Sequence, residues 1–209
     1  MPAFSNCTSD AAEHDSIVRA AQRLAVGALV VYPTETLYGL GADAFNSVAL
    51  QRLIDVKGRE PGKPVAVLVS DGTMLRQLVE EVPSAAAMLM RRFWPGPLTL
   101  VLRAQRWVSP LLTGGGDGIG VRVSSHPMAT ALVRALGRPV TAPSANPAGL
   151  PPPRRVEEVR AYFGARVDVY LDGGCLPGEP ASTVVDARGE LRVLRQGAIA
   201  ASLLPLGTA

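Results

Sequence analysis

Two cations stand one residue apart, where together they could hold a polyphosphate. Lys57 and Arg59 flank Gly58 directly after a helix predicted over residues 46–56. A lysine offers phosphate oxygens a point charge, and an arginine offers them a planar fork of donors. Basic residues at a helix C-terminus also complement the helix dipole, so the pair alone is compatible with either role.

A hydroxyl and an amide follow an apolar segment at residues 140–142. Ser144 and Asn146 stand on either side of Ala145, within the sequence PSANPAG. Their side chains can bind phosphate oxygens or a ribose. Serine, asparagine and proline equally favour simple turns, and that alternative stays open.

An arginine lies inside the apolar segment at residues 119–123. The guanidinium of Arg122 is always charged, so among apolar neighbours it must find an anionic partner or reach solvent. Ser182 and Arg195 repeat the combination of a hydroxyl and a guanidinium near the end of the chain. These residues indicate an anionic ligand.

Polar residues also follow the apolar start of the segment 29–43, LVVYPTETLYGLGAD. The first three residues suit a strand buried on both faces, and Pro33 ends it because proline has no N–H to donate. Ligands of open α/β sheets collect beyond such strand ends. Gly39 and Gly41 could let the backbone approach a ligand closely or adopt positive φ angles. An ordinary surface turn is the alternative.

Alternating helices and strands are predicted to position these residues. Helical spacing occurs over residues 16–26, 46–56, 73–79, 84–92, 127–136 and 156–163. Strands are predicted over residues 29–31, 65–69, 98–102, 119–123, 140–142, 167–171, 183–186 and 191–195. Because the late strands follow one another without helices, the sheet should be mixed. We predict one α/β domain over residues 15–200, a loose N-terminal tail over residues 1–14 and a short C-terminal tail over residues 201–209.

Length and composition indicate a single globular domain with its own core. The 209 residues are 47% hydrophobic and 19% charged, and 21 Lys+Arg against 18 Asp+Glu leave a net charge of +3. That charge is too small to identify a nucleic-acid binder. No apolar run reaches the length of a membrane span and no basic leader is present, so we predict a soluble, cytoplasmic protein without membrane contact.

Several common kinds of site are excluded by their missing motifs. Neither GxxxxGK[ST] nor GxGxxG after a strand occurs, which excludes the standard nucleotide-binding loops. Cys7 and Cys175 lie far apart with no CxxC, and His14 and His126 lie in neither a metal nor a triad pattern. We therefore predict no protein-held metal, no disulfide framework and no histidine base.

Seven strings of residues resemble, in their order and spacing, the YrdC/TsaC family. They are PTETLYGLG, KGR followed by KP, FWPGPLTLVL, GVRV followed by HP, PSANPAG, STVVD and RQG, and they span about residues 15–200. The resemblance implies a YrdC-like twisted mixed sheet, parallel and antiparallel, with flanking helices and a concave basic surface. It also implies the activity of a threonylcarbamoyl-AMP synthase, a nucleotidyltransferase.

The resemblance carries roles to particular positions. The family's signature for ATP phosphates matches Lys57, Arg59, Ser144 and Asn146. The positions that line the threonine end match Thr34, Arg122 and Ser182. A nucleotide-contacting arginine matches Arg195. The residues expected to act in catalysis are Lys57, Arg59 and Arg122.

Three positions depart from the family's pattern. Ser124 replaces the proline usual after the strand arginine, Ala148 replaces a serine, and Ala142 stands where a serine or threonine is common. The last two remove hydroxyls expected near the pocket, which bears on the preference for threonine over serine. The chain ends soon after RQG, so the additional C-terminal domain of longer relatives is expected to be absent.

The family's reaction combines L-threonine, bicarbonate or CO2 and ATP, accompanied by Mg2+, into threonylcarbamoyl-adenylate and pyrophosphate. The product feeds modification of a tRNA adenosine next to the anticodon, so downstream tRNA threonylcarbamoyl transferase proteins are expected partners and a weak RNA contact stays open. One alternative is a carbamoyl-adenylate synthase, whose similar domain sits inside much longer chains. Another is a noncatalytic RNA-binding module, although an aromatic content of 5% leaves few residues for base stacking.

Overall fold

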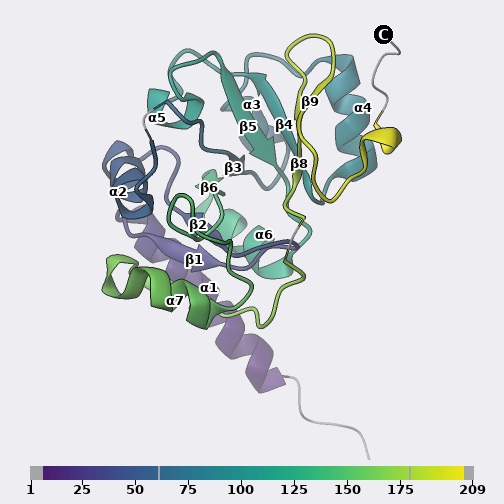
Figure 1. Cartoon of the computed structure of the whole chain (residues 1–209). Helices are drawn as coiled ribbons and strands as arrows, with labels where there is room; N and C mark the ends of the chain where they lie inside the picture. The colour runs from purple at the N-terminus through teal and green to yellow at the C-terminus, as the bar shows by residue number, and fades with distance from the viewer. Residues whose placement is uncertain (1–6, 61, 179, 205–209) are drawn as a thin grey trace, which may run out of the picture.

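Two β-sheets, one of three strands and one of six, form the centre of the fold (Figure 1). The computed structural model describes residues 7–60, 62–178 and 180–204. The smaller sheet, in the order β2-β1-β7, contains β1 Val30–Tyr32, β2 Gly39–Gly41 and β7 Val169–Tyr170. The larger sheet, in the order β6-β3-β5-β4-β8-β9, contains β3 Val67–Leu68, β4 Leu98–Arg103, β5 Gly118–Arg122, β6 Val140–Thr141, β8 Thr183–Asp186 and β9 Arg192–Arg195.

The predicted mixture of strand directions is confirmed in both sheets. Strand β1 pairs antiparallel with β2 and parallel with β7, while β4 pairs antiparallel with β5 and parallel with β8. The strands form two sheets, whereas the sequence indicated one. At the junction, the Thr141 hydroxyl accepts the Ala42 N–H at 2.8 Å and donates to the Leu40 carbonyl at 2.9 Å. Backbone hydrogen bonds continue beside this side chain, since the Thr141 N–H donates to the Ala42 carbonyl at 3.0 Å and the Leu40 N–H donates to the Pro143 carbonyl at 2.9 Å. The two sheets therefore meet along an interrupted pairing of β2 with β6.

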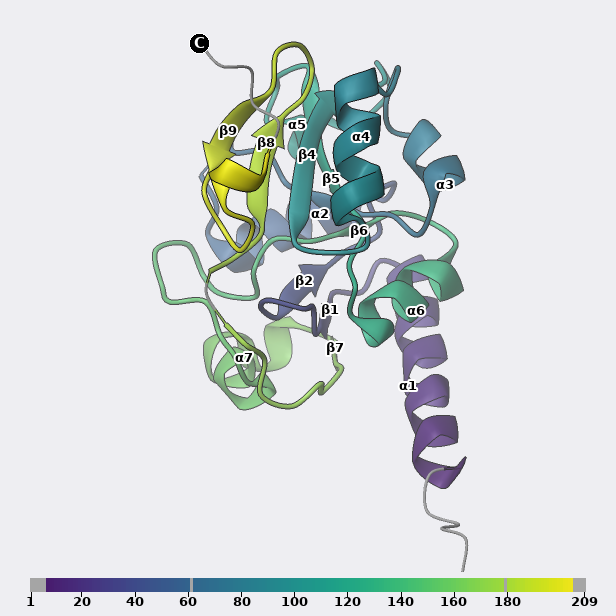
Figure 2. The same cartoon turned by 90° about the vertical axis from the view of Figure 1, so that its right-hand side faces the viewer.

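Helices flank both sheets, as predicted. Figure 2 shows α3 and α4 against the larger sheet and α1 beside α6. The α-helices are α1 Cys7–Ala25, α2 Ser47–Lys57, α3 Gly72–Arg76, α4 Ser84–Phe93, α5 Pro110–Thr113, α6 Pro127–Leu136 and α7 Val156–Phe163. Two 3-10 turns cover Gly164–Arg166 and Ala201–Leu203. In the described ranges, none of these helices combines the length and apolar character that crossing a bilayer requires.

The first helix begins earlier in the chain than predicted. Helix α1 begins at Cys7, so residues 7–14 are helical and the predicted loose tail is wrong over that range. Residues 11–15 are exposed, and their alanines and glutamate extend the helix through intrinsic propensity instead of packing. At the other end, within the predicted short C-terminal tail, a 3-10 turn covers Ala201–Leu203 and Leu204 is buried. Residues 1–6 and 205–209 lie outside the described residues.

A buried tyrosine joins the two sheets and explains two glycines. Tyr32 is fully buried, and its hydroxyl donates to the Thr141 carbonyl at 2.8 Å. A Cβ atom on Gly39 would lie 2.9 Å from the Tyr32 ring, and one on Gly41 would lie 3.0 Å from it. Both are strand residues, and neither has a positive φ angle, so the predicted possibility of a positive φ angle is wrong, although Gly39 does line the cavity described below. They are required because the aromatic ring packs directly on their backbone.

Replacing Tyr32 by phenylalanine should lower the free energy of unfolding by about 1 to 2 kcal/mol, because the buried Thr141 carbonyl loses its donor. Urea unfolding measures this loss. Tyr162→Phe is the matched control, since its hydroxyl donates to the Pro151 carbonyl at an exposed position and should cost under about 0.5 kcal/mol. Equal losses in the two variants would contradict a structural role for the buried hydrogen bond.

Candidate active site

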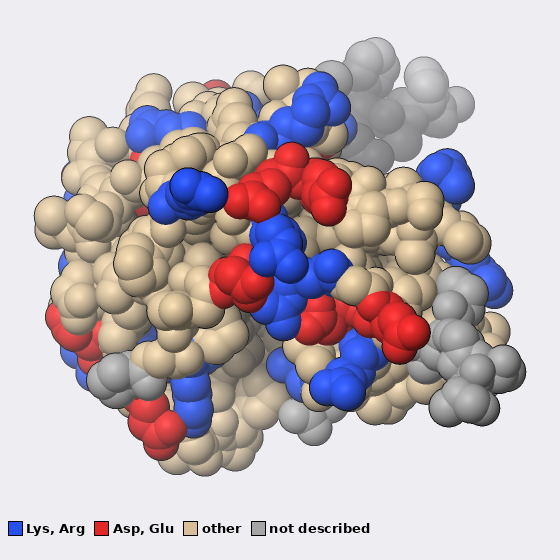
Figure 3. Space-filling view, turned by 90° about the horizontal axis from the view of Figure 1, so that it is seen from above, with Lys and Arg blue, Asp and Glu red and all other residues tan. Residues whose placement is uncertain are grey.

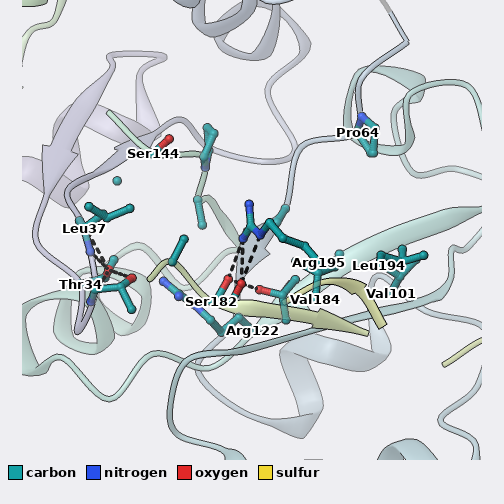
Figure 4. A pocket seen from close by; sticks show the side chains of 18 of the residues that line it. Thr34, Leu37, Pro64, Val101, Arg122, Ser144, Ser182, Val184, Leu194 and Arg195 are labelled. Carbon is teal, nitrogen blue, oxygen red and sulfur yellow. Dashed lines mark hydrogen bonds between the residues drawn. The ribbon is translucent and has the colours of Figure 1, made fainter. Parts of the chain in front are cut away.

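A cavity of about 540 Å³ opens between the loop after β1 and one face of the six-stranded sheet (Figure 4). Part of the lining consists of small residues, among them Ala66, Gly118 and Gly120. Their small side chains leave room for a ligand to come close to the backbone. Four arginines also line the cavity: Arg59, Arg122, Arg188 and Arg195. None of the described lining residues is an aspartate or a glutamate. The cavity is therefore suited to a polyanion.

The structure brings seven of the eight predicted site residues together. Those that line the cavity are Thr34, Arg59, Arg122, Ser144, Asn146, Ser182 and Arg195. They come from the loop after β1, the loop after α2, strand β5, the loop after β6 and the strands β8 and β9 with their preceding residues. The exception is Lys57, which does not line the cavity in the described part of the chain.

Lys57 is buried behind the cavity wall and holds the loop that carries Ser144 and Asn146. It is only 4% exposed, and its Nζ donates to the backbone carbonyls of Ser144 and Asn146 at 2.5 and 2.6 Å. The Ala148 N–H in turn donates to the Lys57 carbonyl at 2.8 Å. Burial, and secondarily the nearby charge of Arg59, lowers the pKa of Lys57 to about 7. In this structure the lysine positions the loop.

The lowered pKa of Lys57 predicts a pH dependence of stability. The unfolded chain keeps this proton up to its ordinary pKa of 10.5, whereas the folded protein releases it above about 7. Between these values the unfolded state binds more protons, so the free energy of unfolding rises with pH, by at most about 1.4 kcal/mol per pH unit. Urea unfolding at several pH values should show this slope in the wild type and lose it in Lys57→Met. If the free energy of unfolding changes with pH in the same way in both proteins, Lys57 is not the source of the pH dependence.

Arg122 projects from β5 into the cavity with its donors unengaged. It is 5% exposed, and among the described residues its guanidinium makes no hydrogen bond. The nearest acidic atom is the Glu35 Oε1, 3.7 Å from the Arg122 Nη1. The predicted need for an anion is thus only partly met inside the protein, and the fork of donors can receive an anionic group from a ligand.

Glu35 lies beside Arg122, and the sequence analysis did not single it out. Its Oε2 accepts a short hydrogen bond from the Ser124 hydroxyl, and its buried Oε1 has no hydrogen-bond partner in the described residues. Ser124 stands where the family usually has proline, and here its hydroxyl holds the carboxylate beside Arg122. The signal was available in the sequence, because a buried arginine needs an anion and Glu35 is the acidic residue of the PTET string.

Arg195 lies over Ser182 on the opposite side of the cavity from Thr34 (Figure 4). Its Nη2 donates to the Ser182 carbonyl at 2.9 Å and to the Ser182 Oγ at 3.2 Å. The Ser182 hydroxyl also lies 3.0 Å from the Thr99 hydroxyl. Burial, and then the charge of Arg122, lowers the pKa of Arg195. Two cations so close together favour a bound anion between or beside them.

Arg59 and Thr34 shape their own loops while they line the cavity. The Arg59 Nη2 donates to the Pro64 carbonyl at 2.7 Å, and burial lowers the pKa of its guanidinium. The Thr34 hydroxyl donates to the Leu37 carbonyl at 2.7 Å. Each residue therefore fixes a loop as well as offering a polar group to the cavity.

The two alanines that depart from the family's pattern differ in position. Ala142 lines the cavity, whereas Ala148 is exposed and does not line it. The expectation that Ala148 removes a hydroxyl near the pocket is wrong, because Ala148 lies in the exposed segment that follows Asn146. Only the substitution at Ala142 changes the chemistry of the cavity wall.

Arg188 is a second lining residue that the sequence analysis missed. Its guanidinium forms ion pairs with Asp117 and Asp186, and these carboxylates raise its pKa further. Seen from above, this end of the molecule shows basic and acidic side chains next to one another and no large patch of one sign (Figure 3). The charge of Arg188 is thus neutralised by two carboxylates, whereas Arg122 makes no hydrogen bond to a carboxylate among the described residues.

The described residues offer the cavity charge and positioning but no strong acid or base. No histidine lines it, and the described chain contains no cluster of three or more His, Cys, Asp or Glu side chains that could hold a metal. Guanidiniums, hydroxyls and backbone groups stabilise a phosphoryl group during transfer by position and charge. The site is therefore suited to phosphoryl or nucleotidyl transfer.

Comparisons with known proteins identify the family of the chain. The Sua5/YciO/YrdC family model, described as "Telomere recombination", matches residues 22–197. A threonylcarbamoyl-AMP synthase of Bacillus subtilis is 38% identical over 199 residues, which are 94% of this chain and 58% of that protein. One of Pyrococcus abyssi is 41% identical over 160 residues, 77% of this chain and 47% of that protein.

A solved structure adds a bound ligand to the comparison. The crystal structure of P. abyssi Sua5 complexed with L-threonine is 39% identical, with a TM-score of 0.86 over 89% of this chain and 55% of that one. This chain spans about half the length of the relatives named here. The shared fold and the match over residues 22–197 establish that the chain belongs to the Sua5/YciO/YrdC family.

Proposed function

We propose that this chain is a threonylcarbamoyl-AMP synthase. It would combine L-threonine, bicarbonate or CO2 and ATP into threonylcarbamoyl-adenylate and release pyrophosphate. The observation that carries the proposal is the cavity itself, which is lined by three guanidiniums, those of Arg59, Arg122 and Arg195, that donate no hydrogen bond to a carboxylate of the described residues. Family membership and the threonine bound to P. abyssi Sua5 support the choice of reaction.

The proposed reaction forms two bonds and breaks one at phosphorus. The amine of threonine, once deprotonated, forms an N–C bond to CO2 and gives a carbamate after loss of a second proton. A carbamate oxygen then attacks the α-phosphorus of ATP, the α–β phosphoanhydride bond breaks, and pyrophosphate leaves. Such a transfer depends on alignment and charge neutralisation more than on a strong base.

The cavity residues fit separate parts of this reaction. Arg122 would hold the carboxylate of threonine, because its donors are unengaged and the loop with Thr34 lies beside it. Arg59 and Arg195 would neutralise the phosphates. Ser182 would orient the amino acid from the other side, since Arg195 fixes its position. Exclusion of bulk water from the cavity would protect the mixed anhydride from hydrolysis.

The lining residues do not form a magnesium site. Mg2+ in ATP-dependent enzymes is usually bound by one or two carboxylates together with phosphates and waters, and no carboxylate lines this cavity in the described residues. We propose that Mg2+ accompanies ATP on its phosphates, and that the protein's own neutralisation of charge comes from the arginines.

The product defines what must act next. A carbamoyl-adenylate is a reactive mixed anhydride, so a transferase must take the threonylcarbamoyl group from it, and we propose the tRNA-modifying transferase proteins of the cytoplasm as partners. Direct RNA binding is not needed for this step. The alternation of charge on the face in Figure 3 offers no broad basic surface there for an RNA backbone.

The proposed function is tested by pyrophosphate release. The purified chain is incubated with ATP, and threonine and bicarbonate are added singly and together. Release that requires all three substrates supports the proposal, with serine in place of threonine as the test of selectivity at Ala142. Release that is independent of the amino acid would indicate an ATPase or another adenylating enzyme.

A further inference from the structure

The guanidinium of Arg122 is open to the cavity. Among the described residues it makes no hydrogen bond. The described side-chain atoms that are both buried and without a partner belong to Glu35, His126 and Asn146, and none belongs to Arg122. Since the nitrogens of Arg122 are unpartnered but not enclosed, they keep contact with the cavity that the residue lines.

A carboxylate lies close to this guanidinium without bonding to it. The Glu35 Oε1 is 3.7 Å from the Arg122 Nη1 and is buried with no hydrogen-bond partner in the described residues. Buried polar atoms are nearly always hydrogen-bonded in folded proteins. An approach of about 1 Å would give the two groups a charge-assisted hydrogen bond of ordinary length. Another contact must therefore hold the carboxylate back.

The hydroxyl of Ser124 supplies that contact. It donates a short hydrogen bond to the other carboxylate oxygen, Glu35 Oε2. Ser124 is itself buried and fixed, because its hydroxyl accepts the His126 N–H at 3.1 Å and its carbonyl accepts the Thr130 hydroxyl at 3.0 Å. His126 is the N-cap of α6, and Thr130 lies in that helix. The Glu35 carboxylate is thus anchored to the start of α6.

This anchoring decides what Arg122 can offer to a ligand. A carboxylate bonded to the guanidinium would occupy the same donors that a ligand's carboxylate needs. At 3.7 Å, Glu35 still offsets part of the buried positive charge but leaves those donors free. Ser124 stands where the family usually has proline, which has no hydroxyl, so this arrangement is a property of this chain.

We propose that Ser124 is a positioning residue, which keeps Glu35 from bonding to Arg122 and so keeps Arg122 available to the carboxylate of the amino-acid substrate. The inference rests on the proposed function, in which Arg122 holds that carboxylate. Neither Ser124 nor Glu35 lines the cavity in the described part of the chain, so both act through Arg122. Without the Ser124 hydroxyl, Glu35 would bond to Arg122 and compete with the substrate.

Isothermal titration calorimetry with L-threonine and L-threoninamide measures the availability of Arg122. The amide lacks the carboxylate, so the ratio of the two affinities reports the carboxylate contact. The wild type should bind threonine at least about tenfold more tightly than the amide. Ser124→Ala should lose most of this preference, through about tenfold weaker binding of threonine and unchanged binding of the amide and of ATP.

Ser70→Ala is the matched control. The Ser70 hydroxyl also donates to a carboxylate, that of Asp71, but at an exposed position, and neither residue lines the cavity. Its removal should leave the affinities for threonine, the amide and ATP unchanged.

Glu35→Gln completes a double-mutant cycle. Glutamine keeps the shape of the side chain but has no negative charge to compete for Arg122, so Glu35→Gln should bind threonine at least as tightly as the wild type. Adding Ser124→Ala to Glu35→Gln should then cause no further loss of threonine affinity. This dependence on Glu35 separates positioning from a general loss of structure, which thermal melts of the variants report independently.

Three results with Ser124→Ala would overturn the proposal: an intact preference for threonine, an equal loss of affinity for threonine, the amide and ATP, or an undiminished effect in the Glu35→Gln background. A large loss of threonine binding in Glu35→Gln alone would also overturn it, and misfolding of Ser124→Ala cannot hide that result. If the wild type itself binds threonine no better than the amide, the role of Arg122 in the proposed function is wrong, and this inference is refuted with it.

Discussion

Replacing Arg122 by lysine should lower kcat/KM for threonine about ten- to a hundredfold, while the KM for ATP changes little. The guanidinium makes no hydrogen bond to the described residues and faces the cavity, so its paired donors are available to a carboxylate. Lysine keeps the charge but loses the planar fork. Loss of one charge-assisted hydrogen bond costs about 1.5 to 3 kcal/mol, which corresponds to that range in kcat/KM.

Arg103→Lys is the matched control for this experiment. Arg103 lies on β4, the strand next to β5, and pairs with Asp117 at an exposed position, so its replacement should change neither constant appreciably. Kinetics with each substrate varied in turn are combined with a thermal melt. If Arg122→Lys lowers the melting temperature and affects both substrates alike, the arginine serves the fold through Glu35 and the assignment to threonine is refuted.

Replacing Lys57 by alanine should lower the free energy of unfolding by about 2 to 4 kcal/mol and weaken ATP binding at the same time. The buried ammonium holds the carbonyls of Ser144 and Asn146 with two short hydrogen bonds. Removal of such a donor leaves buried acceptors unpaired, although the release of a buried charge offsets part of the loss. ATP binding weakens because the loop loses its support.

Lys63→Ala controls for the general effect of removing a lysine near this loop. Lys63 is exposed, and its ion pair among the described residues is with the exposed Glu60, so its loss should cost under about 0.5 kcal/mol. Urea unfolding and ATP titration of both variants separate the two roles of Lys57. An unchanged stability of Lys57→Ala together with weaker tripolyphosphate binding would show that the lysine binds phosphate directly.

The positions of most elements could be predicted from the sequence, because strong local signals mark them. The helix predicted over residues 156–163 and the strand over residues 183–186 agree with α7 and β8 at both ends. Asn46 caps α2 as expected, accepting hydrogen bonds from the N–H groups of Val48 and Ala49. The short helix α5 was missed, since four residues are too few to show a helical period.

The division into two sheets could not be predicted, because it depends on contacts between residues far apart in the sequence. At the junction, the Thr141 hydroxyl accepts the N–H of Ala42, ninety-nine residues away, within an otherwise backbone-paired contact between β2 and β6. Local pattern identifies β6 as a strand but gives no information on whether a side chain interrupts its pairing. Strand existence was therefore predictable, and the arrangement of strands was not.

Most of the residues that line the candidate site could be predicted from the sequence, but the direction in which each side chain points could not. The motifs correctly indicated which loops meet around the cavity. Whether a lysine faces the ligand or the backbone depends on packing, which turned Lys57 away from the cavity and engaged the amide nitrogen of Asn146. Glu35 escaped notice because its role arises only from its proximity to Arg122 and Ser124.

Mass spectrometry of the product tests the central claim most directly. The protein is incubated with ATP, L-threonine and bicarbonate labelled with carbon-13, and the reaction is sampled quickly because the mixed anhydride hydrolyses. The account predicts an adenylate that contains threonine and one labelled carbon, with one pyrophosphate for each adenylate, and far less of it from Arg122→Lys. An unlabelled adenylate of threonine, or a labelled adenylate that forms without threonine, would contradict it.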